Sequence, residues 1–251
     1  MVKLKAAALA SLPVVSLLLV WQLFSLLGFF NPQFLPSPIS VGRDLVDSFT
    51  NQNLLGDIFA RLRRVIIGFL IAAALGVGLG LFAGVNRAAR NFIMPLAELF
   101  RPVPPIAWIP LAILWFGLGD KPAYFLVFLG AFFPIFTNTV FGAMNLEETY
   151  KRAAYSLGAG KKSFLIDILI PASLPHIFAG MRIGLGVGWM AVITSELVGS
   201  QSGLGYMIQL NRFLLNTPKV VVGMVVIGVI GFSLNKLMTR AERVLAPWEK
   251  I

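Results

Sequence analysis

Long apolar runs separated by short polar stretches dominate the hydropathy pattern of the chain. A helix needs about 20 apolar residues to cross the hydrocarbon core of a bilayer. The pattern therefore predicts an all-α, polytopic membrane protein that forms a single transmembrane domain over residues 1–251. The expected spans are about six in number and cover residues 9–30, 63–85, 92–116, 122–144, 176–198 and 220–237.

One polar stretch, residues 147–175, has helical signals of its own. Asn145 and Glu148 have the spacing of a capping box, in which an acid at the third position reaches back to the first backbone amide. Gly158 follows as a natural helix end, because glycine tolerates the left-handed conformation there. A short helix followed by a sharp turn is therefore expected.

A second short helix is predicted over residues 163–170, with Pro171 and Pro175 ending it. On helix signals alone, the whole stretch is either a plain connector between two spans or a segment with a role of its own. Residues 41–55 have the pattern of an amphipathic surface helix.

Glycines and prolines distinguish three of the predicted spans. Glycines at four-residue spacing let helices approach closely in lipid, and they occur at Gly76, Gly80, Gly84, Gly180, Gly184 and Gly188. Prolines remove backbone donors, and four of them interrupt the third span, at Pro102, Pro104, Pro105 and Pro110. Irregular backbone at membrane depth is tolerated where it is buried in protein or lines a cavity, so the third span should face neighbouring helices or a pathway.

Composition supports the membrane assignment and excludes several functions. The chain is 57% hydrophobic and 13% charged, whereas soluble domains are about a quarter charged. It contains no cysteine and a single histidine, His176, which excludes thiolate and histidine-rich metal centres. The net charge of +10 comes from basic residues at the ends of apolar runs, a pattern that marks topology and lipid headgroups rather than nucleic acid.

The distribution of lysine and arginine also predicts the orientation. Most basic residues fall on the side of the two termini and of residues 147–175, which are therefore expected to be cytoplasmic. The cluster at 61–64, which contains Arg61, Arg63 and Arg64, lies on the opposite side and departs from the rule.

No catalytic site emerges from the sequence. LGAGKKS resembles a phosphate-binding loop, but Tyr155 stands where its first glycine is required. Ser195 and Glu196 have no base nearby in sequence. An acid within a span is a candidate functional group by default. Glu196 therefore either lines a gate or pathway or, near the outer end of its span, is hydrated or pairs with a basic residue. The chain is not expected to be an enzyme.

The polar stretch 147–175 also resembles the sequence pattern of a known protein family. Ala153, Ala154, Gly158, Ile168 and Pro171 fall on the spacing of the cytoplasmic loop of ABC-importer permeases, whose pattern is Glu-Ala-Ala, Gly and Ile-x-Leu-Pro. The chain departs from it by an arginine at the glutamate position and an isoleucine at the leucine position. LPSPISV (35–41), PPIAWIPLAILWFGLGDK (104–121) and GWMAVITSELVGSQSGLG (188–205) resemble the nitrate/sulfonate/bicarbonate/taurine branch of these permeases.

The resemblance implies a type I ABC-importer permease fold, with a permease core over about 57–240 and a coupling segment over about 145–175. A helix of this segment would insert into a groove on a cytoplasmic ATPase subunit. The residues implied in this coupling are Glu147, Glu148, Lys151, Arg152, Ala153, Ala154, Leu157, Gly158 and Ala159.

The implied partners are a second permease copy, two ATPase subunits that bind ATP and Mg²⁺, an extracytoplasmic substrate-binding protein and the lipid of a bacterial inner membrane. No cofactor is expected on this chain itself. The dimer would line its pathway with the fifth span and the proline-broken third span. The pathway and gate residues expected are Pro104, Pro105, Trp108, Asn138, Thr139, Arg182, Gly184, Gly188, Met190, Ser195 and Glu196.

Overall resemblance favours nitrate or bicarbonate as the substrate, ahead of an aliphatic sulfonate such as taurine. Asn138, Thr139, Arg182 and Ser195 offer donors or positive charge for an anion. An ion-coupled secondary transporter is the alternative from another class, but it would need an internal repeat and a mid-membrane ion site. An intramembrane enzyme would need paired catalytic groups that the sequence does not supply.

Overall fold

The computed structural model describes residues 2–28, 31, 33–50 and 53–248, with side chains from residue 12 onward. These residues form helices joined by turns and short loops, and they contain no strand. The elements are α1 (Val2–Leu26), α2 (Pro38–Thr50), α3 (Leu54–Val85), α4 (Arg87–Phe100), η1 (Pro105–Trp108), α5 (Ile109–Phe116), α6 (Asp120–Met144), α7 (Glu148–Ser156), α8 (Lys161–Ser163), η2 (Phe164–Leu169), α9 (Ile170–Gly199), α10 (Leu204–Phe213) and α11 (Thr217–Leu245).

The apolar helices confirm the all-α membrane fold and refine the expected spans. Within the described residues, four helices are long and apolar enough to cross a bilayer: α3, α6, the continuous helix 161–199 and α11. The bent pair α4–α5 makes a fifth if it counts as one span. The first expected span coincides with α1, whose described apolar part, Leu12–Leu26, is shorter than the others, while residues 29–30 lie outside the described residues.

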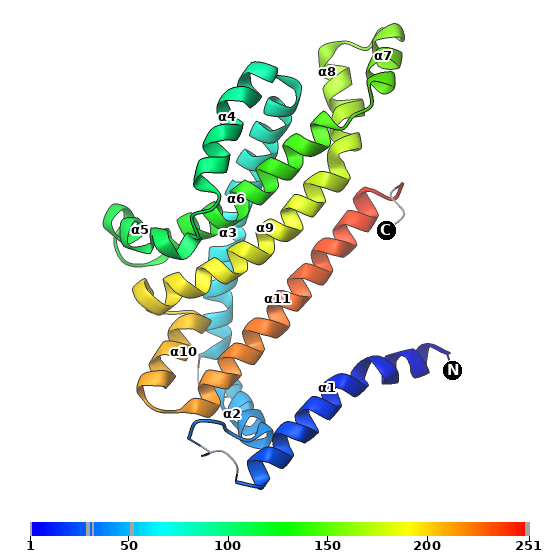
Figure 1. Cartoon of the computed structure of the whole chain (residues 1–251). Coiled ribbons are helices and arrows are strands. Elements are labelled where there is room, and N and C mark those ends of the chain that lie inside the picture. Colours follow the sequence, from blue (N-terminus) through cyan, green and yellow to red (C-terminus); the bar gives the residue numbers. More distant parts are fainter. Residues whose placement is uncertain (1, 29–30, 32, 51–52, 249–251) are drawn as a thin grey trace.

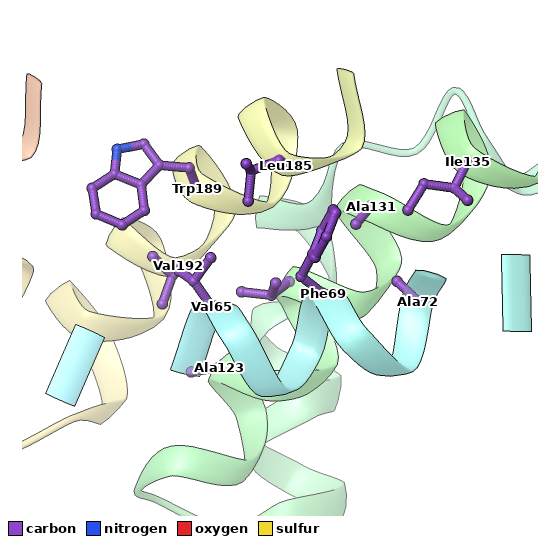
Figure 2. Packing of buried hydrophobic residues seen from close by; sticks show 10 residues of the cluster. Val65, Phe69, Ala72, Ala123, Ala131, Ile135, Leu185, Trp189 and Val192 are labelled. Atoms are coloured by element: carbon purple, nitrogen blue, oxygen red, sulfur yellow. The ribbon is translucent and has the colours of Figure 1, made fainter. Parts of the chain in front are cut away.

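The helices α3, α6 and α9 pack against one another and enclose the main core. Val65, Phe69 and Ala72 of α3 meet Ala131 of α6 and Trp189 of α9 (Figure 2). In Figure 1, α7 and α8 lie at one end of these long helices, whereas α2 and α10 lie at the other. The fold therefore separates the polar stretch 147–175 from the segment that follows α9.

The glycines at four-residue spacing pack as expected. A Cβ added to Gly80 would lie 2.6 Å from the Cβ of Thr139, and one added to Gly184 would lie 2.8 Å from the carbonyl oxygen of Ala131. Both are closer than real Cβ contacts, so side chains at these positions would push α3 or α9 away from α6. These glycines therefore allow the close approach that drives helix association in lipid.

Replacing Gly80 with leucine is expected to destabilise the chain by about 1–3 kcal/mol, because overpacking forces rotamers and backbone to shift. Gly78 on the same helix has open space around it, so Gly78→Leu is the matched control and should leave the thermal midpoint unchanged. The measurement is thermal unfolding of both variants in detergent. Equal midpoints for the two variants would contradict the packing role of Gly80.

The prolines of the third span break it as predicted. After Phe100 the chain leaves α4, passes through the extended Pro104 and forms η1, and α5 then begins with Pro110 in its first turn. The two halves are bent by 87° relative to each other. Since three prolines in four positions remove backbone donors, the residues between Phe100 and Pro105 do not continue α4.

Two expectations about residues 145–175 are wrong. Asn145 is the C-cap of α6, and α7 begins after Glu147, which makes no side-chain capping bond. Pro171 and Pro175 do not end a helix, because 161–199 runs on through both of them. The turns before Pro171 form the π-helix η2, whose wider hydrogen-bond spacing reduces the clash between a proline ring and the carbonyl four residues earlier.

Several boundaries also differ from the sequence expectations. The amphipathic helix expected over 41–55 is α2, which ends at Thr50, and Leu55 belongs to α3 instead. The second, fifth and sixth spans are longer than expected, and α10 was not expected at all. Amphipathic helix ends fall below the hydropathy level that marks a span, which explains why the apolar pattern underestimates these helices.

Candidate functional site

The helix α7 ends as its sequence indicates. Gly158 has a positive φ of 82°, the left-handed conformation that favours glycine. The amides of Gly158 and Ala159 then donate to the carbonyls of Tyr155 and Ala154, at 3.0 Å each. This is a compact helix end that satisfies the last carbonyls of α7.

The two sides of α7 have different environments. Ala154 is 5% exposed and packs with Leu146, Phe164 and Leu169 in a small core of its own. Tyr150 on another side of the helix is exposed, and Leu157, the residue directly after α7, is 89% exposed. Of the two alanines expected in the coupling contact, Ala154 therefore faces the chain's own interior, while Ala153 is exposed.

The charges of α7 are arranged around one acid. Lys151 Nζ lies 3.4 Å from Glu148 Oε2, and Arg152 Nε lies 4.0 Å from Glu148 Oε1. Both pairs are on the surface, where such contacts contribute little stability. Lys151 and Arg152 thus remain accessible to a partner of opposite charge.

A buried cluster of charges lies at the other end of the long helices. Glu196 of α9 is fully enclosed and accepts hydrogen bonds from Arg61 Nη1 and Arg64 Nη1 of α3, at 2.9 Å each. The backbone amide of Gly205 donates to the same carboxylate at 2.9 Å. Arg61 also donates to the carbonyl of Trp189 at 2.8 Å, and its guanidinium stacks 4.2 Å above the Trp189 ring.

Two further acids complete this cluster. Asp120, at the start of α6, accepts from Arg64 Nε at 2.7 Å and also pairs with Arg63. Asp57 of α3 accepts from the backbone amide of Gly203 at 2.7 Å. Three arginines are thus matched by three acids. The cluster joins α3, α6, α9 and the start of α10 into one unit, since buried charges are stable where they are paired and hydrogen-bonded.

A second ion pair connects α9 to α11. Arg182 of α9 pairs with Glu242 of α11, whose side chain is almost completely buried. The guanidinium of Arg182 is bound by this acid, and the pathway role expected for Arg182 stays a prediction. Glu196 has the basic partners that were one of its two interpretations, and a gating role for it likewise stays a prediction.

The other predicted pathway residues lie in three environments. Pro104, Pro105 and Trp108 form the bend between α4 and α5, where Trp108 contacts the rings of Phe100 and Phe125. Met190 is 71% exposed on α9. Four of them are packed between helices: Thr139, Gly184, Gly188 and Ser195. Asn138 is half-buried on α6.

The sequence did not predict which arginines and acids pair in the buried cluster, although one signal pointed to the arginines. Arg61 and Arg64 departed from the expected charge bias, and both pair with the buried Glu196. Asp57 and Asp120 stand at the ends of spans, where an acid looks hydrated. Among the described residues, no group of three His, Asp or Glu side chains is placed to hold a metal ion.

Comparison with known proteins extends these observations. The family of binding-protein-dependent transport system inner membrane components matches residues 76–251. The taurine transport system permease protein TauC of Escherichia coli (strain K12) is 35% identical over 92% of this chain and 86% of its own length. The nitrate import permease protein NrtB of Synechocystis sp. is 31% identical over 93% of this chain and 87% of its own.

A solved structure agrees with the fold. A chain of the MetNI methionine ABC transporter in an inward-facing conformation superposes with a TM-score of 0.68 at 17% identity, covering 76% of this chain and 95% of that chain. This likeness confirms the expected type I importer permease architecture. The family match and the two relatives show that the chain belongs to the family of binding-protein-dependent transport system inner membrane components and is the permease of an ABC importer.

Proposed function

We propose that two copies of this chain form the translocation pathway of an importer. Two cytoplasmic ATPase subunits, which bind ATP and Mg²⁺, would drive it, and an extracytoplasmic binding protein would supply the substrate. The observation that carries the proposal is α7, a nine-residue helix at one end of the long helices with Leu157 89% exposed. Tyr150 and Tyr155 are also exposed on this short segment, and several large exposed side chains that include aromatic rings are typical of a protein–protein contact.

The connections of α7 explain how it would transmit movement. It follows α6 after a three-residue link, and the Gly158 turn leads from it through η2 directly into α9. Because α6 and α9 pack closely through Gly184, a displacement of α7 moves both helices together. At its far end α9 is held to α3 by Glu196, and Arg182 links it to α11. One coupling contact therefore acts on four long helices.

The proposed orientation has α7 and both termini in the cytoplasm of a bacterial cell. The arginines of the 61–64 cluster were the objection to this orientation. Arg61 and Arg64 are almost completely buried and are paired with acids, so they act as part of a neutralised network rather than as free topology signals. The remaining basic residues then follow the positive-inside rule.

The pathway is proposed to lie along the exposed side of α9. Ile183, Gly186 and Met190 repeat at three- and four-residue spacing and are all exposed, so they form one apolar stripe without a partner among the described residues. A second copy would cover part of this stripe. The bent α4–α5 pair would line the same pathway.

The proposed substrate is a small oxyanion, nitrate or bicarbonate. The nitrate import permease NrtB, which is 31% identical, supports the nitrate part of this assignment. A sulfonate such as taurine is the second candidate, because the taurine permease TauC is 35% identical. Both candidates present a planar or pyramidal group of oxygens with negative charge, so the same kind of hydrogen-bond donor would contact either.

The experiment is reconstitution of the purified complex, with its ATPase subunits and binding protein, into liposomes. Separate assays with labelled nitrate, bicarbonate and taurine should show uptake that requires ATP and the binding protein. Uptake by the permease alone, driven by an ion gradient without the ATPase, would establish a secondary transporter and refute the proposal.

A further inference from the structure

A groove of about 420 Å³ lies between α4 and α6. Glu98 and Arg101 line it from α4, and Thr137, Asn138 and Phe141 line it from α6. Arg101 is the C-cap of α4, directly before the bend that leads into η1 and α5. The groove thus has a mixed polar and apolar lining, and it ends where the backbone of the third span becomes irregular.

Taken together, the two halves of the bent pair α4–α5 are long and apolar enough for one span, and Arg101 stands at the break between them. Its helix has 14 residues, so at 1.5 Å per residue Arg101 lies about 20 Å along the axis from the first turn of α4. An ionisable side chain at such depth faces protein or a water-filled cavity rather than lipid. Irregular backbone at membrane depth obeys the same rule. Both features indicate that this end of the groove is hydrated.

Arg101 differs from the arginines that are paired with acids between the long helices. Arg61 and Arg64 bind Glu196, and Arg182 binds Glu242. Arg101 forms no ion pair within the part of the chain that the structure describes, although Glu98 stands one turn before it. An exposed guanidinium has five N–H donors in a fixed fork, the geometry that matches a planar group of oxygens.

Asn138 supplies a second donor in the groove. Its amide nitrogen donates one hydrogen to the carbonyl of Pro134 at 2.8 Å, which leaves the other hydrogen of the same nitrogen available. Thr137 forms the adjacent wall, and its hydroxyl is held by the carbonyl of Phe133 at 2.9 Å. Glu98 adds a negative charge, which opposes tight anion binding. A transport site requires such weak binding, because the ion must leave again.

We propose that Arg101 and Asn138 form a transient binding site for the oxyanion or sulfonate group of the transported substrate. Glu98 lowers the affinity of this site. The proposal rests on the proposed function, because it identifies where the anion of that importer contacts the permease. It assigns the anion contact to the groove between α4 and α6.

The first test measures the charge of the groove and needs no knowledge of the substrate. Since the chain has no cysteine, Thr137→Cys introduces a single thiol at the groove wall. The complete complex in lipid nanodiscs is treated with methanethiosulfonate reagents of similar size, one carrying a sulfonate and one a trimethylammonium group. The ratio of the two reaction rates reports the local potential.

Adding Arg101→Gln to Thr137→Cys is expected to lower the sulfonate-to-ammonium rate ratio about tenfold, because one nearby positive charge is lost. Adding Glu98→Gln should raise the ratio. Arg87→Gln is the matched control, since Arg87 is on the same helix outside the groove, and the ratio should not change. Two results would overturn the proposal. One is a thiol that neither reagent labels, as expected for a groove filled by lipid, and the other is a rate ratio that Arg101→Gln does not change.

The second test uses ATP-driven uptake by the reconstituted complex. For whichever of nitrate, bicarbonate and taurine the wild type carries, Arg101→Gln should lower uptake about tenfold while the complex still assembles, and Arg101→Lys should restore part of it. Wild-type uptake that persists unchanged in Arg101→Gln refutes this site and leaves the importer function intact. A wild-type complex that carries no anion refutes the proposed function instead.

Discussion

Replacing Glu196 with leucine is expected to lower the stability of the folded chain by about 3–5 kcal/mol, because it leaves two buried arginines without their acid. Glu196 is fully enclosed, and it accepts from Arg61, Arg64 and the amide of Gly205. Leucine fills a similar volume but provides no acceptor. The measurement is thermal or denaturant unfolding of the purified complex, and the expected result is a large drop in the midpoint.

Arg63→Gln is the control for this effect, since Arg63 pairs with Asp120 from the surface, with its side chain 59% exposed. Exposed pairs contribute less than about 1 kcal/mol, so its midpoint should hardly move. The conservative Glu196→Gln keeps one acceptor oxygen, and we expect it to assemble with the ATPase while its transport changes. If Glu196→Leu unfolds at the wild-type midpoint, the buried cluster does not hold the four helices together.

Replacing Gly158 with valine is expected to uncouple ATP hydrolysis from transport. The φ of Gly158 is 82°, and an L residue in the left-handed region costs about 1–2 kcal/mol. Strain of this size reduces the population of the native turn about tenfold. Since the turn orients α7 relative to η2 and α9, uptake per ATP hydrolysed should fall by a similar factor.

Gly160→Val is the matched control for the turn. Gly160 is exposed like Gly158, has open space around it, and has an ordinary φ of −74°. Valine is acceptable there, so uptake per ATP should remain close to that of the wild type. Coupling that stays normal in Gly158→Val, or that falls equally in both variants, would contradict the role of the left-handed turn.

The sequence predicts those parts of the fold that depend on local patterns. The apolar runs located the long helices, Gly158 ended α7 as expected, and Gly80 and Gly184 pack against α6. These features follow from hydropathy, from the conformational freedom of glycine and from its small size. The bend after α4 also follows, because the prolines remove backbone donors regardless of the surroundings.

The parts that escaped prediction depend on contacts between distant residues. Arg61 and Glu196 are 135 positions apart, and no local pattern joins them. The only sequence signal was indirect, in that Arg61 and Arg64 broke the charge bias. Pro171 was misjudged for a related reason, since the π-helix before it forms in the context of the packed helix 161–199 rather than from any single residue.

The groove between α4 and α6 was not predicted from the sequence, although Asn138 was among the expected anion donors. Arg101 and Asn138 belong to different helices, and only the antiparallel packing of α4 and α6 brings them to one cavity. Arg101 and Arg182 both lie within predicted spans, 92–116 and 176–198, and only Arg182 was expected in the pathway. The structure distinguishes them, because Arg182 is paired with Glu242.

The most direct test of the account is cross-linking at α7. Ala153 is exposed on α7, and the chain contains no native cysteine, so Ala153→Cys can carry a single photoactivatable group. Leu214→Cys, exposed after α10 at the opposite end of the long helices, is the control. We predict that the label at position 153 captures the ATPase subunit in intact cells and the label at 214 does not. Capture of the ATPase subunit by the label at 214, or its capture by neither label, would contradict the claim that α7 couples this permease to its ATPase subunits.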